Sequence, residues 1–291
     1  MASTLDCVIC LMRQSLEAAR FATKNEEMHA QILERVMKLF IERGVTASPP
    51  IIGTVVHRVV REITGDDDPY AAEKRRFNRD AYARWDDIQR SIKTARDPFE
   101  AAVRLAIAGN SIDFALESIN EEKINAAIAN ALDAPLRGSI DALRDAILAA
   151  NSILYLTDNA GEIVYDKAFV ELLAAPQFEK SVTVATRGAP IINDALRSDA
   201  EEIGFDKIAR LVDNGGDGLG TIFELTSEEF NREFLAADLV IAKGLANYET
   251  LAFPQKNALE PKKIAFLFKA KCPFIAREAG ADLGDLIIKM A

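Results

Sequence analysis

The sequence predicts an α/β fold, in which an open and mostly parallel β-sheet follows an all-helical N-terminal region. Over roughly the first 150 residues, apolar side chains recur at the 3.6-residue period of a helix. After Asn151, five short apolar runs alternate with helix-length segments, which is the pattern of successive βαβ units. We therefore expect a helical cap domain over residues 1–150, part of which can pack on the sheet, and an α/β domain over residues 151–291.

The predicted helices of the first half follow one another closely. Apolar side chains with helical spacing cover residues 10–21, 32–40 and 52–63. Gly44 ends the second of these helices, and Ser48-Pro49-Pro50 opens a short loop before the third. Residues 71–92 carry many charges and few apolar side chains, which is typical of an exposed helix. An alanine-rich helix then starts at Asp97-Pro98 and runs to Gly109.

The strands of the second half are predicted from nearly continuous apolar runs. Such runs are typical of parallel strands that are covered on both faces of a sheet. They comprise residues 152–157, 181–186, 208–212, 238–242 and 263–268.

Composition narrows the possible partners and location. Of the 291 residues, 49% are hydrophobic and 27% are charged, as in ordinary globular proteins. The net charge of −10 argues against nucleic acid as a partner, because a phosphate backbone needs a basic surface. No apolar run approaches the ~20 residues of a membrane-spanning helix, and Met1 to Asp6 show no signal-peptide pattern. We expect a cytoplasmic protein without a nucleic-acid or membrane partner.

Polar residues and glycines follow each predicted strand. Because the carboxyl ends of parallel strands meet at one rim of a sheet, these groups should converge on one crevice. Carboxylates and amides suit Mg²⁺ or Mn²⁺, whereas lysines and helix N-termini suit a phosphate. The groups are Asp158-Asn159, Arg187-Gly188 with Asn193-Asp194, Asp213-Asn214 with the glycine-rich 215–220, Lys243-Gly244 with Asn247 and Glu249, and Lys269-Ala270-Lys271.

Each junction also has a purely structural explanation. An Asp or Asn after a strand is often only a helix N-cap. The glycine-rich segment could be a turn, since it lacks the G-x-G-x-x-G order of a dinucleotide site. Lys243 or Lys269 alone could be a solvated strand end. Five junctions with complementary chemistry favour a site.

Four ordered motifs together resemble those of the damage-control phosphatase family. The motifs are Asp158-Asn159-Ala160-Gly161-Glu162, Gly188-Ala189-Pro190-Ile191-Ile192-Asn193-Asp194, Lys243-Gly244-x-x-Asn247-x-Glu249 and Lys269-Ala270-Lys271-Cys272-Pro273. Residues 109–113 also resemble the family's G-N-x-x-D element, which places Asn110 and Asp113 in it. Cys7-x-x-Cys10 points to the prokaryotic subgroup with a cysteine pair. The resemblance covers nearly the whole chain.

The resemblance implies a metal-dependent phosphatase with a helical domain capping a Rossmann-like α/β/α sandwich. Its substrates would be small phosphorylated metabolites, such as damaged or side-product sugar or cofactor phosphates. The family's metal ligands fall on Asp158, Asn159 and Asp194, for Mn²⁺, Mg²⁺, Co²⁺ or Ni²⁺. Its phosphate-binding lysine falls on Lys269, with Lys271 as the alternative register. The signatures of the sugar-phosphate and phosphopantetheine subgroups are absent, so neither substrate is implied.

These residues give a mechanistic hypothesis. The ion held by the three ligands would polarise the phosphoryl group and align an attacking water, although Asp158 could instead attack phosphorus itself. Lys243 and the lysine at position 269 would neutralise the phosphoryl oxygens. The other expected substrate contacts are N–H groups near Gly188 and Gly244, the side chains of Asn193, Asn247 and Glu249, and Asn110 and Asp113 reaching from the cap to the leaving group.

Two other classes of protein remain possible from the residues alone. A Rossmann-like sheet with a glycine-rich third loop could serve a transferase that binds a nucleotide or cofactor. Cys7 and Cys10, with Cys272 as a third thiol, could make a non-catalytic redox or metal sensor, although buried small thiols are common. His29 and His57 fall in helical patterns and are expected to be packed or solvated rather than ligands. The oligomeric state is not predicted.

Overall fold

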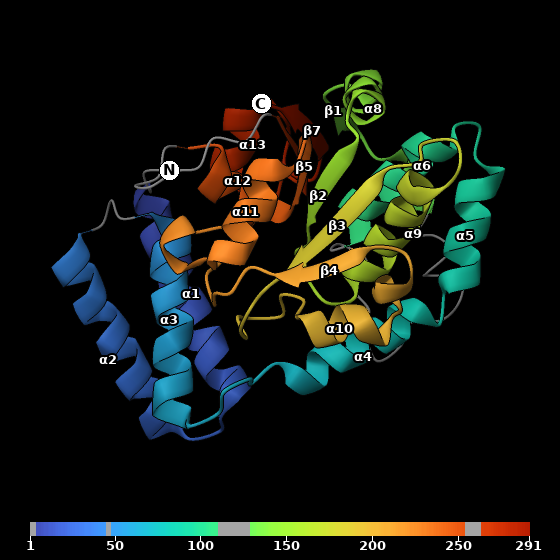
Figure 1. Ribbon diagram of the computed structural model, residues 1–291. Helices are drawn as coiled ribbons and strands as arrows, with labels where there is room; N and C mark the ends of the chain where they lie inside the picture. The colour runs from blue at the N-terminus through green and yellow to red at the C-terminus, as the bar shows by residue number, and fades with distance from the viewer. Residues whose placement is uncertain (1–3, 45–47, 110–128, 254–262) are drawn as a thin grey trace.

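The computed structural model describes residues 4–44, 48–109, 129–253 and 263–291. Within these residues the chain forms a central β-sheet with helices on both faces and three N-terminal helices at one side (Figure 1). The strands run in the order β1-β7-β6-β5-β2-β3-β4. The predicted α/β class with a mostly parallel sheet is confirmed.

All five predicted strands are present, with bounds that differ from the prediction by at most two residues. They are β2 (Ser152–Leu156), β3 (Ser181–Thr186), β4 (Arg210–Asp213), β5 (Leu239–Lys243) and β6 (Ile264–Lys269). Each is parallel to its neighbours among the five.

Two further strands were not predicted. β7 (Leu286–Met290) pairs antiparallel with β6, and β1 (Leu136–Arg137) pairs with β7. A strand of two residues carries no periodic signal. The uninterrupted apolar run of β7 ends before Lys289 and is too short to distinguish from a loop by composition.

Helices connect the strands, as in βαβ units, although the last of them leads into the antiparallel β7. In chain order they are α9 (Glu162–Ala174), α10 (Arg197–Glu202), α11 (Glu228–Ala236), α12 (Gly244–Leu251) and α13 (Pro273–Ala279). Short 3₁₀ turns at Phe205–Lys207 and Phe223–Leu225 complete the connections. Local signals start two of these helices: the Ser227 hydroxyl accepts the N–H of Phe230 in α11, and Pro273 opens α13.

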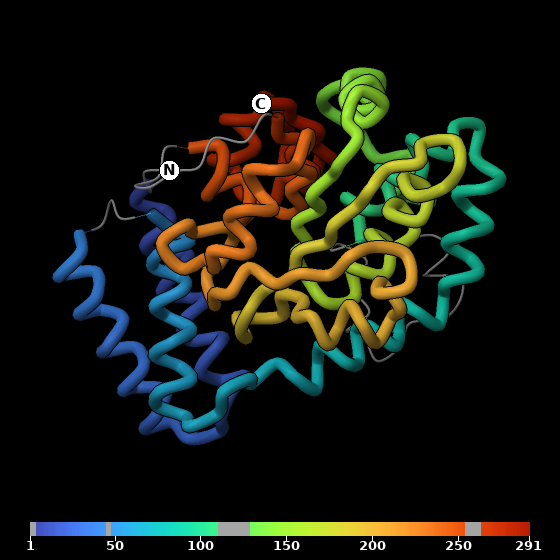
Figure 2. The backbone as a smooth tube through the Cα atoms, in the orientation of Figure 1, coloured from blue at the N-terminus to red at the C-terminus, as the bar shows by residue number. Residues whose placement is uncertain are grey.

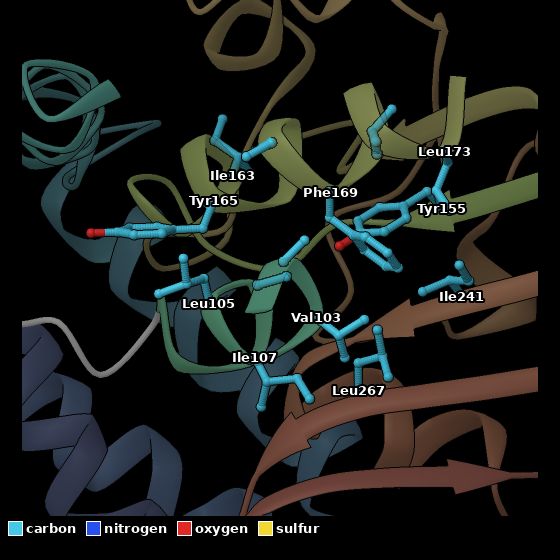
Figure 3. Close-up of a cluster of buried hydrophobic side chains, with 14 of the residues drawn as sticks. Val103, Leu105, Ile107, Tyr155, Ile163, Tyr165, Phe169, Leu173, Ile241 and Leu267 are labelled. Carbon is cyan, nitrogen blue, oxygen red and sulfur yellow. The ribbon is translucent and has the colours of Figure 1, made fainter. Parts of the chain in front are cut away.

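The sheet has a hydrophobic core on each face. Because side chains alternate along a strand, Tyr155 of β2 faces the cluster around α9, whereas Leu156 faces α11, α12 and α13. Figure 3 shows the first cluster, in which Tyr155 and Ile241 of the sheet lie close to Phe169 of α9. Both layers are needed to bury strands that are apolar on both faces.

The N-terminal half divides between two cores. The helices α1 (Leu5–Ala22), α2 (Glu26–Arg43) and α3 (Pro49–Thr64) surround a hydrophobic cluster of their own. In contrast, α5 (Trp85–Thr94), α6 (Pro98–Ala108) and α8 (Ile140–Ala149) contribute side chains to the core on the α9 face of the sheet. The change from one core to the other therefore comes near α4 (Ala71–Tyr82), well before residue 150.

The expectation of one exposed helix over residues 71–92 was wrong. The chain forms two helices there, α4 and α5, which are separated at Ala83 and Arg84. Lys74, Asn78 and Ala81 of α4 are buried, because this face of α4 meets α9 and α10. The buried face of α4 is partly polar, and for that reason the sequence pattern indicated an exposed helix.

A loop from the sheet contacts α3 directly. The carboxylate of Asp217 pairs with Arg58 and Arg61 of α3, and the N–H of Leu219 donates to the Thr54 hydroxyl over 3.0 Å. In the tube view this orange loop, which follows β4, extends to the blue N-terminal helices (Figure 2). Among the described residues, no helix combines the length and apolar character that crossing a membrane demands.

Candidate functional site

The candidate site lies beyond the carboxyl end of β2. In the sheet β2 stands between β3 and β5. The chain leaves β2 toward β3 on one side and later returns to form β5 on the other side. The loops after β2 and β5 therefore diverge, and open α/β sheets bind ligands at such a point.

Backbone pairing brings two polar segments together above β2. Asn159 and Asp194 form an isolated antiparallel bridge. The N–H of Ala195 donates to the carbonyl of Asp158, and the N–H of Ala160 donates to the carbonyl of Asn193, each over 2.8 Å. Asp158 and Asn159, which follow β2, and Asp194, which lies beyond β3, therefore meet at one place.

The two acids of this set are almost fully buried. Asp158 is 6% exposed and Asp194 is 3% exposed. Burial raises the pKa of Asp158 well above its ordinary value, and the charges of Glu162 and Asp194 raise it further. Burial likewise raises the pKa of Asp194, against the opposing effect of Arg187. A cation bound between the two carboxylates would favour their ionised forms.

The donor set fits a hard divalent ion. It offers two carboxylates and an amide, all oxygen donors of the kind that Mg²⁺ and Mn²⁺ accept. The amide NH₂ of Asn159 donates to Asp158 Oδ2 over 2.9 Å and to Glu162 Oε2 over 3.4 Å, which leaves the amide oxygen for a ligand. Among the described residues, no three His, Cys, Asp or Glu side chains gather around a possible metal position. The candidate centre therefore depends on the amide as its third donor.

Gly244 lies directly against the carboxylate of Asp158. Its φ is +80°, and a Cβ atom placed on it would lie 2.0 Å from Asp158 Oδ2. Only glycine combines that backbone conformation with so close an approach. The first turn of α12 thus begins directly against the Asp158 carboxylate, where its partial positive charge stabilises the anion.

The ammonium group of Lys243 lies inside the protein and not in the crevice. Lys243 is 0% exposed, and its Nζ donates to the carbonyl of Ala106 over 2.7 Å, to Glu162 Oε1 over 2.6 Å and to Asp166 Oδ1. Three acceptors use all three of its hydrogens. The expected contact between Lys243 and a phosphate is therefore corrected to a buried ion cluster, in which the two carboxylates raise the lysine pKa against the effect of burial.

Comparison with known proteins supports a family assignment. The profile described as the damage-control phosphatase ARMT1-like domain matches residues 3–287. The chain belongs to the damage-control phosphatase family.

Relatives of the chain include members of the family from archaea. A protein named damage-control phosphatase from Archaeoglobus fulgidus is 34% identical over 98% of this chain and 97% of its own length. Another, from Pyrococcus horikoshii, is 32% identical over 97% of this chain and 96% of its own length. An uncharacterized protein of Methanocaldococcus jannaschii is 36% identical over 97% of this chain and 93% of its own length.

A solved structure of the family has the same fold. The crystal structure of a DUF89 family protein from P. horikoshii superposes with a TM-score of 0.89 and 30% sequence identity, covering 99% of this chain and 98% of that chain. Membership of the damage-control phosphatase family supports a phosphatase that acts in metabolite repair.

Several other predicted contacts of this damage-control phosphatase chain are used within the protein. The Asn247 side chain donates to the carbonyls of Lys243 and Thr157 and accepts the Thr221 hydroxyl. The N–H of Gly188 donates to Gly216 and to the side chain of Asn214. Neither group is free for a phosphate, so both expected contacts are corrected to hydrogen bonds within the protein. The described contact of Asn193 is the backbone carbonyl that pairs with Ala160.

The two C-terminal lysines differ in their relation to the site. Lys271 is exposed, and its charge lowers the pKa of Asp158, against the larger effect of burial. Lys269 is partly buried, which lowers its own pKa, with the Lys271 charge adding to the shift. Of the two lysines, only Lys271 is among the charges that act on the Asp158 carboxylate. Asn110 and Asp113 lie outside the described residues.

Two polar residues near the site were given no role in the sequence prediction. Asn78 of α4 accepts the N–H of Gly161 over 2.7 Å and donates to Asp199 over 2.9 Å, so it fixes the loop after β2. Arg187, directly after β3, donates from Nε to Asp194 over 2.7 Å. Nothing in the sequence distinguishes Asn78 from other polar residues of a charged helix. Arg187, in contrast, stands directly after a predicted strand, where polar residues were expected to gather.

The cysteines and histidines stand on or next to α1, α2, α3 and α13. Cys7 Sγ lies 3.4 Å from the hydroxyl of Thr4, which precedes α1. Cys272 precedes α13. His57 is buried, and burial lowers its pKa to about 4, with Arg61 contributing. A histidine with this pKa is neutral at pH 7, and its burial agrees with the expected packed position.

Replacing Gly244 by alanine should damage the site selectively. The new Cβ would meet the Asp158 carboxylate, so we expect the phosphatase activity of G244A to fall by on the order of a hundredfold. The matched control is G280A, because Gly280 has a similar φ of +67° but nothing within 4 Å of the added Cβ. Both variants bear backbone strain, and only G244A should lose activity. Equal activities measured with an aryl phosphate would contradict this account.

Glu249 should make folding stability depend on pH between about 4.5 and 7. Burial raises its pKa from 4.5 to about 7. In that range the unfolded chain releases the proton while the folded chain retains it, so stability falls as pH rises and levels off above about 7. Relative to E249Q, we expect the wild type to lose on the order of 2–3 kcal/mol across the range. Urea unfolding of both proteins at several pH values measures this difference; parallel profiles would contradict it.

Proposed function

We propose that the chain is a divalent-metal-dependent phosphatase that hydrolyses phosphomonoesters of small metabolites. The observation that carries the proposal is the convergence of two buried carboxylates and one amide beyond the end of β2. Family membership supplies the reaction class, and the donor set supports the metal. Mn²⁺, Mg²⁺, Co²⁺ and Ni²⁺ are the candidate ions.

In this proposal Asp158, Asn159 and Asp194 hold the ion through oxygen atoms. When bound, it would draw electron density from the phosphoryl oxygens. Glu162 accepts the Asn159 NH₂, and Lys243 in turn donates to Glu162. Lys243 and Glu162 are therefore positioning residues, which fix the rotation of a ligand amide without touching substrate.

The proposed reaction is attack of water on the phosphoryl group. A new P–O bond forms from water, the ester P–O bond breaks, and a proton from water passes to the leaving alkoxide, giving an alcohol and inorganic phosphate. We favour water over Asp158 as the nucleophile, because the Asp158 carboxylate is covered by Gly244 and accepts from Asn159. Lys271, whose exposed charge acts on Asp158, would attract the phosphate dianion.

A nucleotide-binding transferase is disfavoured by the glycine-rich loop. A phosphate-binding loop presents free backbone N–H groups to its ligand. Here the N–H groups of Gly215 and Gly216 donate to the side chains of Asp213 and Asn214, and that of Leu219 donates to Thr54. The loop is thus a structural brace. A sensor built on Cys7 and Cys10 would leave the buried carboxylates unexplained.

The decisive activity test changes each acid to its amide. D158N and D194N keep the volume but remove the charge, so we expect each to lose aryl phosphatase activity by on the order of a hundredfold or more with any of the four metals. D145N is the control, because Asp145 is an exposed acid on α8 and should have no effect. Metal-dependent turnover that survives in both amide variants would refute the assignment.

A further inference from the structure

Arg187 carries a buried donor group that the fold does not use. The side chain follows β3 and is 4% exposed. Its Nε donates to Asp194 Oδ2 over 2.7 Å, and its Nη1 donates to the carbonyl of Gly220 over 2.8 Å. Its Nη2 is buried and has no hydrogen-bond partner within the described part of the chain. Buried polar atoms without partners are uncommon in folded proteins, and such an atom calls for a partner outside the protein, which is a water, an ion or a ligand.

The planar guanidinium indicates where that ligand would sit. Nε–H and one hydrogen of Nη2 point to the same side of the guanidinium, as the two donors of a fork. Because Nε already meets Asp194, Nη2 faces the neighbourhood of that carboxylate. The Arg187 charge also lowers the pKa of Asp158, against the dominant effect of burial, so it lies near both candidate metal ligands.

The backbone holds Arg187 in place. Its N–H donates to the carbonyl of Ala195 over 3.0 Å, and the residue forms a parallel bridge with Leu196. The side chain is fixed at two of its three nitrogens. The third donor is therefore presented in a set direction, which is how proteins recognise phosphate with arginine.

We propose that Nη2 of Arg187 donates a hydrogen bond to a phosphoryl oxygen of the substrate and of the phosphate product. The proposal rests on the function proposed above, because it places the phosphoryl group beside Asp158 and Asp194. Arg187 would then be a catalytic residue that the sequence prediction did not include. The task of neutralising the phosphoryl oxygens, which was expected of Lys243 at the end of β5, would fall to Arg187 after β3. The site would select a tetrahedral phosphate anion, with Lys271 attracting it and Arg187 orienting it.

A purely structural role for Arg187 makes a different prediction. If its task were only to balance the charge of Asp194, a lysine could keep much of that effect, since R187K retains a positive charge. A lysine cannot, however, offer the second donor of the fork. Under our proposal, R187K should therefore lose phosphate affinity but keep its metal affinity. Under a purely structural role, both affinities should stay near those of the wild type.

The experiment compares wild type, R187K and R61K by calorimetry. Mn²⁺ is titrated first, and inorganic phosphate is then titrated into the Mn²⁺-loaded proteins. Arg61 is the matched control, because it too is a largely buried arginine that pairs with an aspartate and a backbone carbonyl, in this case Asp217 and Pro190. Aryl phosphatase KM and kcat are measured for the same three proteins.

We expect R187K to bind phosphate tenfold to a hundredfold more weakly, the range for a charge-assisted hydrogen bond, while its Mn²⁺ affinity changes by roughly threefold or less. R61K should match the wild type in its affinity for phosphate and in its affinity for Mn²⁺. Unchanged phosphate affinity in R187K overturns the role of Arg187, as does an equal loss of Mn²⁺ affinity. A wild type without Mn²⁺-dependent turnover overturns the proposed function itself, and this inference with it.

A second measurement does not depend on the folding of a variant. Wild-type protein is crystallised with Mn²⁺ and orthovanadate, a tetrahedral analogue of phosphate. We expect a vanadate oxygen within hydrogen-bond distance, about 2.7–3.2 Å, of Arg187 Nη2. A vanadate bound near Asp158 and Asp194 but out of reach of this nitrogen would overturn the proposal.

Discussion

The backbone pairing between residues 158–160 and 193–195 is the constraint on which the site depends. It joins the loops after β2 and β3 by hydrogen bonds that no side chain can replace. As a result two carboxylates lie in a place where burial and mutual repulsion oppose their charge. Such an arrangement persists in a folded protein when neighbouring groups hold it and when a ligand offsets the repulsion.

The surrounding charges show how the protein holds this arrangement. Arg187 pairs with Asp194 on one side, while Lys243 anchors Glu162, which contacts Asn159, on the other. The Lys243 cluster also reaches α6 through the carbonyl of Ala106. The helical half therefore supports the candidate site from within the core, so both halves of the chain hold the candidate metal ligands in place.

The meeting of the three candidate ligands could be predicted from the sequence, because each follows a predicted strand. Asp158, Asn159 and Asp194 follow apolar runs whose strand character was clear, and parallel pairing then forces them together. The sequence could not reveal burial. Lys243 and Gly188 stand at equally good junctions, yet their donors turn to Glu162 and Gly216. The direction in which a donor points depends on packing with segments distant in sequence, such as α4 and α6. It cannot be predicted from the type of residue.

The most direct test of the metal centre is calorimetric titration of the purified protein with Mn²⁺. The account predicts one ion per chain for the wild type, and binding that is lost or weakened at least tenfold in D158N and in D194N. Unchanged Mn²⁺ affinity in both variants, or a wild type that binds no Mn²⁺, Mg²⁺, Co²⁺ or Ni²⁺, would contradict it.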